Sequence, residues 1–405
     1  MKRPYLGWYF AIAVLALLPA GLRMLSWHLR WSRGIDPVMA EAGRTLFSHE
    51  WTPNDPLSPD GDGLGPVFNA ASCVACHDRG GVGGSGGLEH NVTLSRMIRP
   101  QFKDAQPIEG VVHAQAVPGV QPDDRAIRRL SDELGRTEFS QRNTPALFGA
   151  RLINEIPERV ILAQERAERL KWGGMVNSNE EKLPVGRAPR LANGKLGRFG
   201  WKAQTASLSD FVQAACANEL GLGNPGQAQP RPLSMPNYQP RGLDLTLEQC
   251  DQLTAFVASL PRPTERLPDA GSAREEAAEG KKLFGTVGCA DCHTPKLGTV
   301  EGLYSDLLLH RMGVKLIASG SYNRQPQTLP DLPSEDGSQP DEWRTPPLWG
   351  VADSAPYMHD GRANTFVEAI QHHGGQGERA AQRFARLGMV EQNQLVAFLQ
   401  TLRAP

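Results

Sequence analysis

The chain has almost no net charge and few aromatic residues. Its 405 residues include 43 Lys and Arg against 44 Asp and Glu, which gives a formal net charge of −1. No excess of one sign is available to attract nucleic acid or a strongly charged partner. Aromatic residues make up 7% of the chain, whereas there are 42 Gly and 32 Pro. This balance favours a loop-rich protein whose short helices are held together by a buried cofactor rather than by a large sheet.

Long apolar runs are absent except at the N-terminus. Lys2 and Arg3 precede an apolar segment over residues 6–22. That length lies between the core of a signal peptide and a membrane-spanning helix, and both interpretations place the following chain outside the cytoplasm. A small-residue cleavage site is poorly formed, and the following Trp and Arg residues resemble a membrane-interface flank. We therefore expect residues 1–35 to anchor the protein to the inner membrane, with a cleaved signal peptide as the alternative.

Cysteine is scarce, and its placement decides the class of protein. Four of the six cysteines fall in two copies of Cys-x-x-Cys-His, which is the attachment pattern of haem c. Two thiols one helical turn apart reach the two vinyl groups of one porphyrin, and the adjacent His presents its imidazole to the iron. A structural zinc site would need four ligands in tetrahedral reach. We therefore predict two covalently bound haem c groups. The predicted attachment and iron-binding residues are Cys73, Cys76 and His77 for the first haem and Cys289, Cys292 and His293 for the second.

The other two cysteines, Cys216 and Cys250, leave two alternatives open. Each sits in an apolar pattern with helical spacing, where a buried free thiol is common. A disulfide between them is equally compatible with an oxidising compartment.

Three short patterns occur twice in the same order, which indicates an internal duplication. Each copy has one pattern before its haem motif and two after it, and the last pattern has the apolar spacing of a helix. The patterns are Gly-x-x-Leu-Phe at residues 43–47 and 280–284, Thr-Pro-x-Leu-aromatic-Gly at residues 144–149 and 345–350, and Gln-Leu-x-Ala-Phe at the start of residues 252–260 and 394–402. The expected fold is therefore mainly α, with two cytochrome c-like haem modules.

The module boundaries follow from the same repeat. An exposed linker is expected over residues 262–272, where Pro, Gly and charged residues replace the apolar period. The first module then covers residues 36–261 and the second residues 273–405. The first is the longer, and we expect loop and hairpin insertions to enlarge it. A Gly-rich segment at residues 80–87 is expected to be a mobile loop.

Spacing within the repeat also predicts the sixth ligand of each iron. His373 lies 28 positions after the Thr of its Thr-Pro pattern, and the same count in the first copy reaches Trp172. Because the indole nitrogen of Trp is only a donor, it cannot bind iron. We predict that His373 closes the second iron, with His372 as the alternative ligand, and that the first iron lacks a matching ligand. His90 is the alternative ligand at the first iron.

Several strings considered together resemble a known family. They are residues 63–69, 144–149, 197–202, 344–350, 359–362 and 373–375. Their combination is similar to the di-haem oxidoreductases, often labelled thiol oxidoreductase-like, which are related to bacterial di-haem cytochrome c peroxidases. The resemblance covers nearly all of the chain after about Ala40.

The resemblance implies roles for particular residues. In the peroxidases a Pro-Tyr-x-His-x-Gly segment precedes the distal ligand of the electron-accepting haem, usually Met; residues 356–361 match this segment, and His373 stands at the ligand position. A His there in place of Met is expected to lower the potential. The family also places a Glu and a Gln above the open haem and a Trp between the haems. Glu155 and Gln164 lie in the corresponding region, which makes Glu155 the candidate catalytic acid-base group, whereas no Trp occurs at the expected offset. His359 is expected to be a hydrogen-bonding or inter-haem residue.

The predicted function is that of a peroxidase-like di-haem oxidoreductase. Electrons are expected to enter at the C-terminal haem, and peroxide or another small substrate to react at the N-terminal haem. A pure electron-transfer di-haem cytochrome c is the alternative from a different class, and redox modification of a partner protein is a third hypothesis. The expected partners are an electron-donor protein or small redox carrier, hydrogen peroxide or an unknown small substrate, and the inner membrane, with no nucleic acid. The expected location is the periplasmic side of that membrane.

Overall fold

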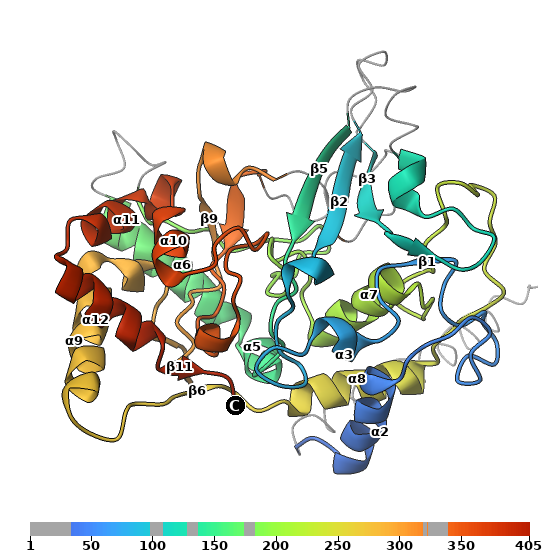
Figure 1. Ribbon diagram of the computed structural model, residues 1–405, viewed down its shortest axis with the longest axis horizontal. Helices are drawn as coiled ribbons and strands as arrows, with labels where there is room; N and C mark the ends of the chain where they lie inside the picture. Colours follow the sequence, from blue (N-terminus) through green and yellow to red (C-terminus); the bar gives the residue numbers. More distant parts are fainter. Residues whose placement is uncertain (1–33, 98–107, 128–136, 174–182, 319–321, 323–338) are drawn as a thin grey trace, which may run out of the picture.

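Figure 1 shows the computed structural model, which describes residues 34–97, 108–127, 137–173, 183–318, 322 and 339–405. The predicted anchor at residues 1–35 falls almost entirely outside these ranges. Among the described residues, no helix is both long and apolar enough to cross a membrane. The fold is rich in helices and loops with only short strands, which agrees with the predicted mainly α class.

Most helices form two groups that correspond to the two halves of the repeat, whereas α6 of the first half lies beside the second group (Figure 1). In the first group, α2 packs along α8 and α7 lies beside them; in the second, α9 packs along α12. The helices are α2 (Pro37–Ser48), α3 (Cys73–Cys76), α5 (Ala150–Glu155), α6 (Glu158–Trp172), α7 (Leu208–Leu220), α8 (Leu247–Ser259), α9 (Ser272–Val287), α10 (Phe366–Gln371), α11 (Glu378–Ala385) and α12 (Met389–Leu399).

Glycine lets the paired helices of both groups approach each other closely. A Cβ atom at Gly43 of α2 would lie 1.9 Å from the Gln252 carbonyl oxygen of α8, and one at Gly280 of α9 would lie 1.8 Å from the Gln394 carbonyl oxygen of α12. The repeated Gly-x-x-Leu-Phe and Gln-Leu-x-Ala-Phe patterns are therefore the two sides of one helix crossing, which occurs twice. Here the glycine is required by the lack of space rather than by backbone conformation.

The two halves share part of their core. The larger apolar cluster includes Phe47 and Phe256 from the first half together with Leu303 and Trp349 from the second, whereas a smaller cluster around Phe284 lies within the second half. Burying apolar surface between the halves fixes them against each other. Cys216 and Cys250 also lie in the larger cluster, as buried free thiols. Burial raises the pKa of Cys250 to about 12, so this thiol stays neutral.

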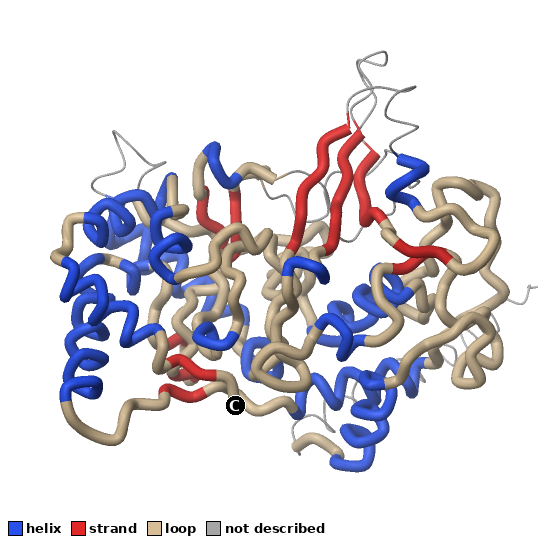
Figure 2. The backbone as a smooth tube through the Cα atoms, in the orientation of Figure 1, coloured by secondary structure: helices blue, strands red, loops and turns tan. Residues whose placement is uncertain are grey.

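A three-stranded antiparallel sheet, which was not predicted, extends from the first half (Figure 2). Its order is β3-β2-β5, with Leu94 of the central strand opposite Val111 and Ser140. The strands are β1 (Val67–Phe68), β2 (Val92–Met97), β3 (Ile108–Val112), β4 (Gln115–Ala116), β5 (Thr137–Arg142), β6 (Thr264–Glu265), β7 (Lys296–Leu297), β8 (Val300–Glu301), β9 (Leu309–Arg311), β10 (Glu342–Arg344) and β11 (Leu402–Arg403).

Part of the predicted linker is paired. Within residues 262–272, β6 forms an antiparallel ladder with β11, and the Arg266 amide donates to the Thr401 carbonyl oxygen. The connection between the halves is therefore held against the second half by backbone hydrogen bonds.

Candidate functional site

The first Cys-x-x-Cys-His motif forms a single helical turn that ends at its histidine. Ser72 caps α3 by accepting from the Ala75 amide, and His77 occupies the C-cap position. The Nδ1 atom of His77 lies 3.0 Å from the Gly84 carbonyl oxygen. That carbonyl accepts only, so it fixes the proton on Nδ1 and leaves Nε2 as a lone-pair donor suited to a metal. Burial lowers the pKa of His77 to about 4, which keeps the ring neutral.

The Gly-rich segment predicted to be a mobile loop therefore orients His77. A Cβ atom at Gly84 would lie 1.7 Å from the Arg79 carbonyl oxygen, so the segment folds tightly against itself. Its amides also contribute, since the Gly83 amide donates to the carbonyl oxygen of His77.

The second motif has the same arrangement in a different local helix. Cys289–Asp291 form a 3-10 turn, and His293 follows it. Its Nδ1 atom lies 3.0 Å from the Tyr304 carbonyl oxygen. Burial, together with the nearby His373, lowers the pKa of His293 to about 4. Both motif histidines are therefore neutral and present Nε2.

His373 faces His293 across the second site. The two ring centres are 6.4 Å apart, with 61° between the ring planes. His373 lies just beyond the end of α10, and its Nδ1 atom is 2.8 Å from the Ala369 carbonyl oxygen. Burial lowers the pKa of His373, so it is a third neutral imidazole with Nε2 left over. The alternative, His372, does not line the cavity that contains His373 and His293.

The loop and helix that carry His373 have a counterpart in the first half. A backbone bridge joins Tyr357 to Ala363 in the second half, and one joins Phe199 to Thr205 in the first. Positive φ angles occur at the same two places in each loop: Met358 and Gly361 in the second, Gly200 and Ala203 in the first. Two residues after each bridge, Thr365 caps α10 and Ser207 caps α7, each accepting from the amide three residues on.

This alignment corrects the predicted counterpart of His373. Sixteen positions after Tyr357 comes His373, and sixteen after Phe199 comes Ala215, in the middle of α7. Trp172 is not the counterpart: it ends α6 and lines the cavity of the second motif. The count from the Thr-Pro pattern was wrong because α6 and the following segment lie between that pattern and α7 only in the first half.

Ala215 lines a second cavity, and polar groups stand beside it. This cavity also contains Cys73, Cys76 and His77. One helical turn beyond Ala215, Glu219 faces the same space, where its Oε2 atom accepts from the Asn69 amide at 3.0 Å. Burial raises the pKa of Glu219, whereas hydrogen bonds from Tyr322 and Asn69 act in the opposite direction. His90, the alternative ligand, also lines this cavity.

The two polar residues suggested by the family resemblance lie elsewhere. Glu155 ends α5, where its Oε1 atom is 2.6 Å from Nε of Arg151, and 42% of its side chain is exposed. Gln164 donates to Glu168 on α6. Neither residue lines either cavity. Glu219 lies four residues after Ala215 on the same helix, so the two face the same side. The sequence could have indicated Glu219 only if Ala215 had already been known to face the cavity.

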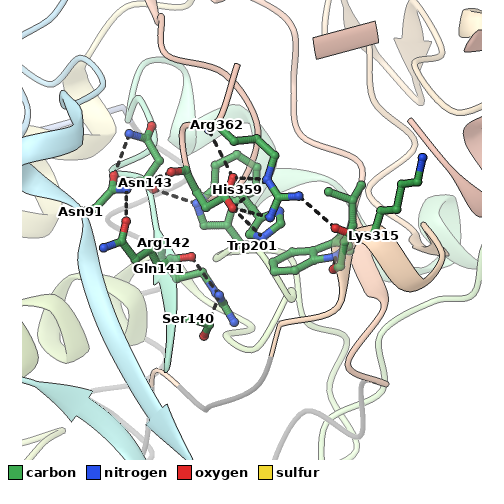
Figure 3. A network of polar contacts seen from close by, with 12 residues as sticks. Asn91, Ser140, Gln141, Arg142, Asn143, Trp201, Lys315, His359 and Arg362 are labelled. Carbon is green, nitrogen blue, oxygen red and sulfur yellow. Dashed lines mark hydrogen bonds and ion pairs between the residues drawn. The ribbon is translucent and has the colours of Figure 1, made fainter. Parts of the chain in front are cut away.

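The two cavities share a wall, here named the shared wall. It consists of the residues that line both cavities: Asn143, Thr144, Pro145, Leu147, Gly200, Trp201 and Phe211. Trp201 therefore lies between the two sites. The sequence comparison had not identified it, because it does not occur at the offset expected for the family's inter-haem Trp. Its Nε1 atom donates to the Asn143 carbonyl oxygen at 2.8 Å, and the Asn143 amide donates to the His359 carbonyl oxygen at 2.6 Å. Figure 3 shows Asn91, Asn143, Trp201 and His359 in this network.

His359 and Trp343 extend this wall as an aromatic stack. Their ring centres are 3.7 Å apart and nearly parallel, and Trp201 meets His359 edge-on at 6.5 Å. Lys202 Nζ lies 4.0 Å and Arg142 Cζ 4.9 Å from the centre of the Trp343 ring. Burial lowers the pKa of His359 to about 3, so a neutral imidazole completes the stack.

The residues present fit a haem in each cavity. The cavities measure about 320 Å³ at the second motif and about 220 Å³ at the first. Burial raises the pKa of Cys73, Cys76 and Cys289 to about 12, which leaves neutral thiols. Two cysteine thiols and an outward-facing Nε2 in an apolar pocket suit a porphyrin and its iron.

Comparison with known proteins points the same way. Residues 129–402, about two thirds of the chain, match the family model described as "Di-haem oxidoreductase, putative peroxidase". The methylamine utilization protein MauG of Methylorubrum extorquens is 27% identical over 159 residues, which cover 38% of this chain and 42% of that protein. The cytochrome-c peroxidase IdrP2 of Pseudomonas sp. strain SCT is 29% identical over 157 residues, which cover 33% of this chain and 41% of that protein.

These matches are partial. The chain spans about two fifths of the length of the two curated relatives. Among solved structures, the diheme peroxidase BthA from Burkholderia thailandensis E264 is 15% identical, with coverage of 91% of this chain and 86% of that one and a TM-score of 0.41. Such a superposition establishes no residue correspondence.

Proposed function

The chain belongs to the di-haem oxidoreductase family, and from that premise we propose that it is a peroxidase-like c-type oxidoreductase. Electrons enter at the second site, and peroxide or another small substrate reacts at the first. The observation that carries this proposal is the exchange of His373 for Ala215 at equivalent positions of the two halves.

Each haem is attached by its own motif. Thioether bonds would join the first haem to Cys73 and Cys76 and the second to Cys289 and Cys292, and His77 and His293 would bind the respective irons. The backbone carbonyls that hold Nδ1 of both histidines support this role, since a fixed tautomer makes Nε2 a better ligand.

His293 and His373 would both bind the second iron. Metal–imidazole bonds are about 2 Å long, so rings that bind opposite faces of one metal have centres roughly 6 Å apart. The separation of 6.4 Å between His293 and His373 agrees with this requirement. A site closed by two protein ligands exchanges electrons but binds no substrate, which suits electron entry.

The first iron keeps a face for substrate. Ala215 offers no ligand atom, and Glu219 stands one turn away in the same cavity. A haem bound there supplies the redox chemistry, and the chain's own groups position the substrate and move its proton. Because burial raises the pKa of Glu219, its carboxyl group is suited to hold and return a proton. Asn69 fixes the orientation of that carboxyl group through its amide.

Trp201 connects the two sites in this scheme. It lines both cavities, and its indole is held by the Asn143 carbonyl oxygen. An aromatic ring that spans the shared wall shortens the gap that an electron must cross between the haems.

The modules, partners and location proposed from the sequence complete this scheme. Residues 36–261 and 273–405 form the two cytochrome c-like modules, with residues 262–272 as their connection and with insertions in the first. The electron source is a donor protein or small redox carrier on the periplasmic side. Anchoring through residues 1–35 stays a prediction.

Cyanide binding tests the proposal. In the ferric protein with both haems, we expect cyanide to convert one high-spin haem to the low-spin state and to leave the other spectrum unchanged. His77→Ala should abolish the response. If neither haem binds cyanide in any redox state, the result would favour the pure electron-transfer protein, with His90 as the group that closes the first iron.

A further inference from the structure

A buried group of ionisable side chains lies against the second site. Asp306 and His310 are 0% and 2% exposed, and Glu168 of α6 is 4% exposed. The Cys292 Sγ atom is 3.7 Å from Nδ1 of His310, so this group touches the point where the second haem is attached. The haem-binding scheme uses none of these three residues.

Hydrogen bonding fixes the charge of His310. Its Nε2 atom is 2.9 Å from an Asp306 carboxylate oxygen, and its Nδ1 atom is 3.0 Å from Oε1 of Gln376. The Gln376 amide nitrogen donates to the Val185 carbonyl oxygen, so its oxygen is the atom that faces His310. Both ring nitrogens therefore donate to acceptors. His310 is an imidazolium that neutralises Asp306.

Glu168 accepts one hydrogen bond at each of its carboxyl oxygens. Its Oε1 atom accepts from Gln164 at 3.0 Å and its Oε2 atom from the Gly186 amide at 2.8 Å. Burial and the charge of Asp306 raise the pKa of Glu168 to about 8, partly opposed by His310. Glu168 thus ionises near pH 8.

Other charged groups around Glu168 have partners of their own. On α6, Glu165 is paired with Arg169 and with Arg190. On the interior side, Arg344 lines the cavity of the second motif, and the charge of Asp306 stabilises its charged form. Arg187, next to Gly186, pairs with Glu342 at 2.6 Å.

We propose that Glu168 takes up a proton when the second haem accepts an electron and releases it when that haem is oxidised. This inference rests on the proposed function, in that the second site holds a redox-active haem. The electron comes from the donor and goes to the iron, while a proton from solvent goes to a Glu168 carboxylate oxygen. Added negative charge in a buried, low-dielectric site favours the neutral carboxyl form, so the two events are coupled.

The direction of the coupling can be worked out. Reduction raises the pKa of Glu168, so the reduced protein binds more protons than the oxidised protein in a window around pH 8. The reduction potential of the second haem must therefore fall as pH rises through that window. For one proton per electron the slope is about 59 mV for each tenfold change in proton concentration.

A potentiometric titration of the full-length protein with both haems tests this. The potential of the bis-imidazole haem, followed by its low-spin spectrum between about pH 6 and about pH 10, should be flat at low pH and fall above the window's start. In Glu168→Gln, which mimics the protonated form, the potential should stay at the acidic value throughout. Glu165→Gln on the same helix is the matched control and should keep the wild-type slope.

Two outcomes overturn the proposal: a flat wild-type profile, or a slope that persists in Glu168→Gln. If Glu168→Gln does not fold, infrared difference spectra of the wild-type protein decide. Reduction above pH 8 should then produce a protonated carboxyl band that shifts in deuterium oxide. Absence of this band would contradict the proposal. Cyanide binding at the first haem does not depend on this slope. Failure of the proposed function can therefore be distinguished from failure of the proton-uptake proposal.

Discussion

The two halves of the molecule hold their cavities with a similar capped loop and differ in the helix that follows it. Both have a bridged loop with two positive φ angles, a hydroxyl cap and a helix that faces the cavity. In the second half α10 stops after six residues, and His373 follows its end; in the first, α7 continues for thirteen residues through Ala215. The difference teaches that the same capped loop can lead either to a residue with a ligand atom or to one without, depending on where the following helix ends.

The largest change that we expect is the loss of one haem from one half of the molecule while the other half keeps its haem. Replacing both Cys73 and Cys76 by Ser should remove one haem from the purified protein, and replacing both Cys289 and Cys292 should remove the other, because each pair supplies one set of thioether bonds. The measurement is the protein mass together with the haem that survives acid-acetone extraction. Loss of both haems from one double variant, or zinc in their place, would contradict two independent attachment sites.

Exchanging the distinguishing residue should reverse the comparison. Ala215→His is expected to close the first iron and abolish its cyanide response, whereas His373→Ala should open the second iron and create a response there. Electron paramagnetic resonance of the ferric proteins reports the change between high-spin and low-spin states. His372→Ala is the control and should leave both spectra as in wild type. An unchanged second haem in His373→Ala would assign its ligand to another residue.

A smaller effect is expected from the acid-base group that only the first cavity holds. Glu219→Gln should keep both haems but slow the reaction with peroxide by about a hundredfold or more, the contribution of a positioned proton-transfer group. Stopped-flow spectroscopy measures the rate. Glu155→Gln is the paired variant, since Glu155 is the candidate that the family resemblance suggested. The variant that reacts slowly identifies the acid-base group. Wild-type rates in both variants would exclude both Glu219 and Glu155 from that role.

The smallest effect concerns the helix crossing that both halves share. Gly280→Ala should lower the free energy of unfolding by roughly 1–3 kcal/mol, because the added Cβ would meet the Gln394 carbonyl oxygen and force α9 and α12 apart. Gly285→Ala is the control in the same helix: its Cβ meets no atom within 4 Å, so a stabilisation of about 0.5–1 kcal/mol is expected. Thermal unfolding of both variants gives the comparison. Equal effects of the two would show that the crossing tolerates a side chain.

Local patterns in the sequence predicted the features that depend on contiguous residues. The haem motifs, the paired Gly and Gln patterns and the closing helices α8 and α12 all lie within short strings, so their spacing survives insertions elsewhere. His373 was predicted for the same reason, because it follows its loop without interruption, and it lies opposite His293.

Features that depend on long-range contacts could not be predicted in this way. The counterpart of His373 was assigned to Trp172 because the count crossed an insertion, whereas the bridged loop leads to Ala215. Glu219 shows no sequence signal until its helix is known to face the cavity. The sheet of β2, β3 and β5 joins strands separated by segments of ten or more residues, and such pairings are set by tertiary structure more than by local preference.

The hydrogen bonds that orient His77, His293 and His373 also bear on how these sites can evolve. Each Nδ1 atom is held by a main-chain carbonyl oxygen, of Gly84, Tyr304 and Ala369 respectively. No substitution deletes a main-chain carbonyl, so mutation at these residues leaves the acceptor atom in place. A side chain matters only through the backbone conformation: a Cβ atom at residue 84 would lie 1.7 Å from a backbone oxygen, and Tyr304 has a positive φ angle. The orientation of these histidines therefore tolerates sequence changes at the residues that supply the carbonyl oxygens, whereas a single substitution of the histidine itself removes the ligand.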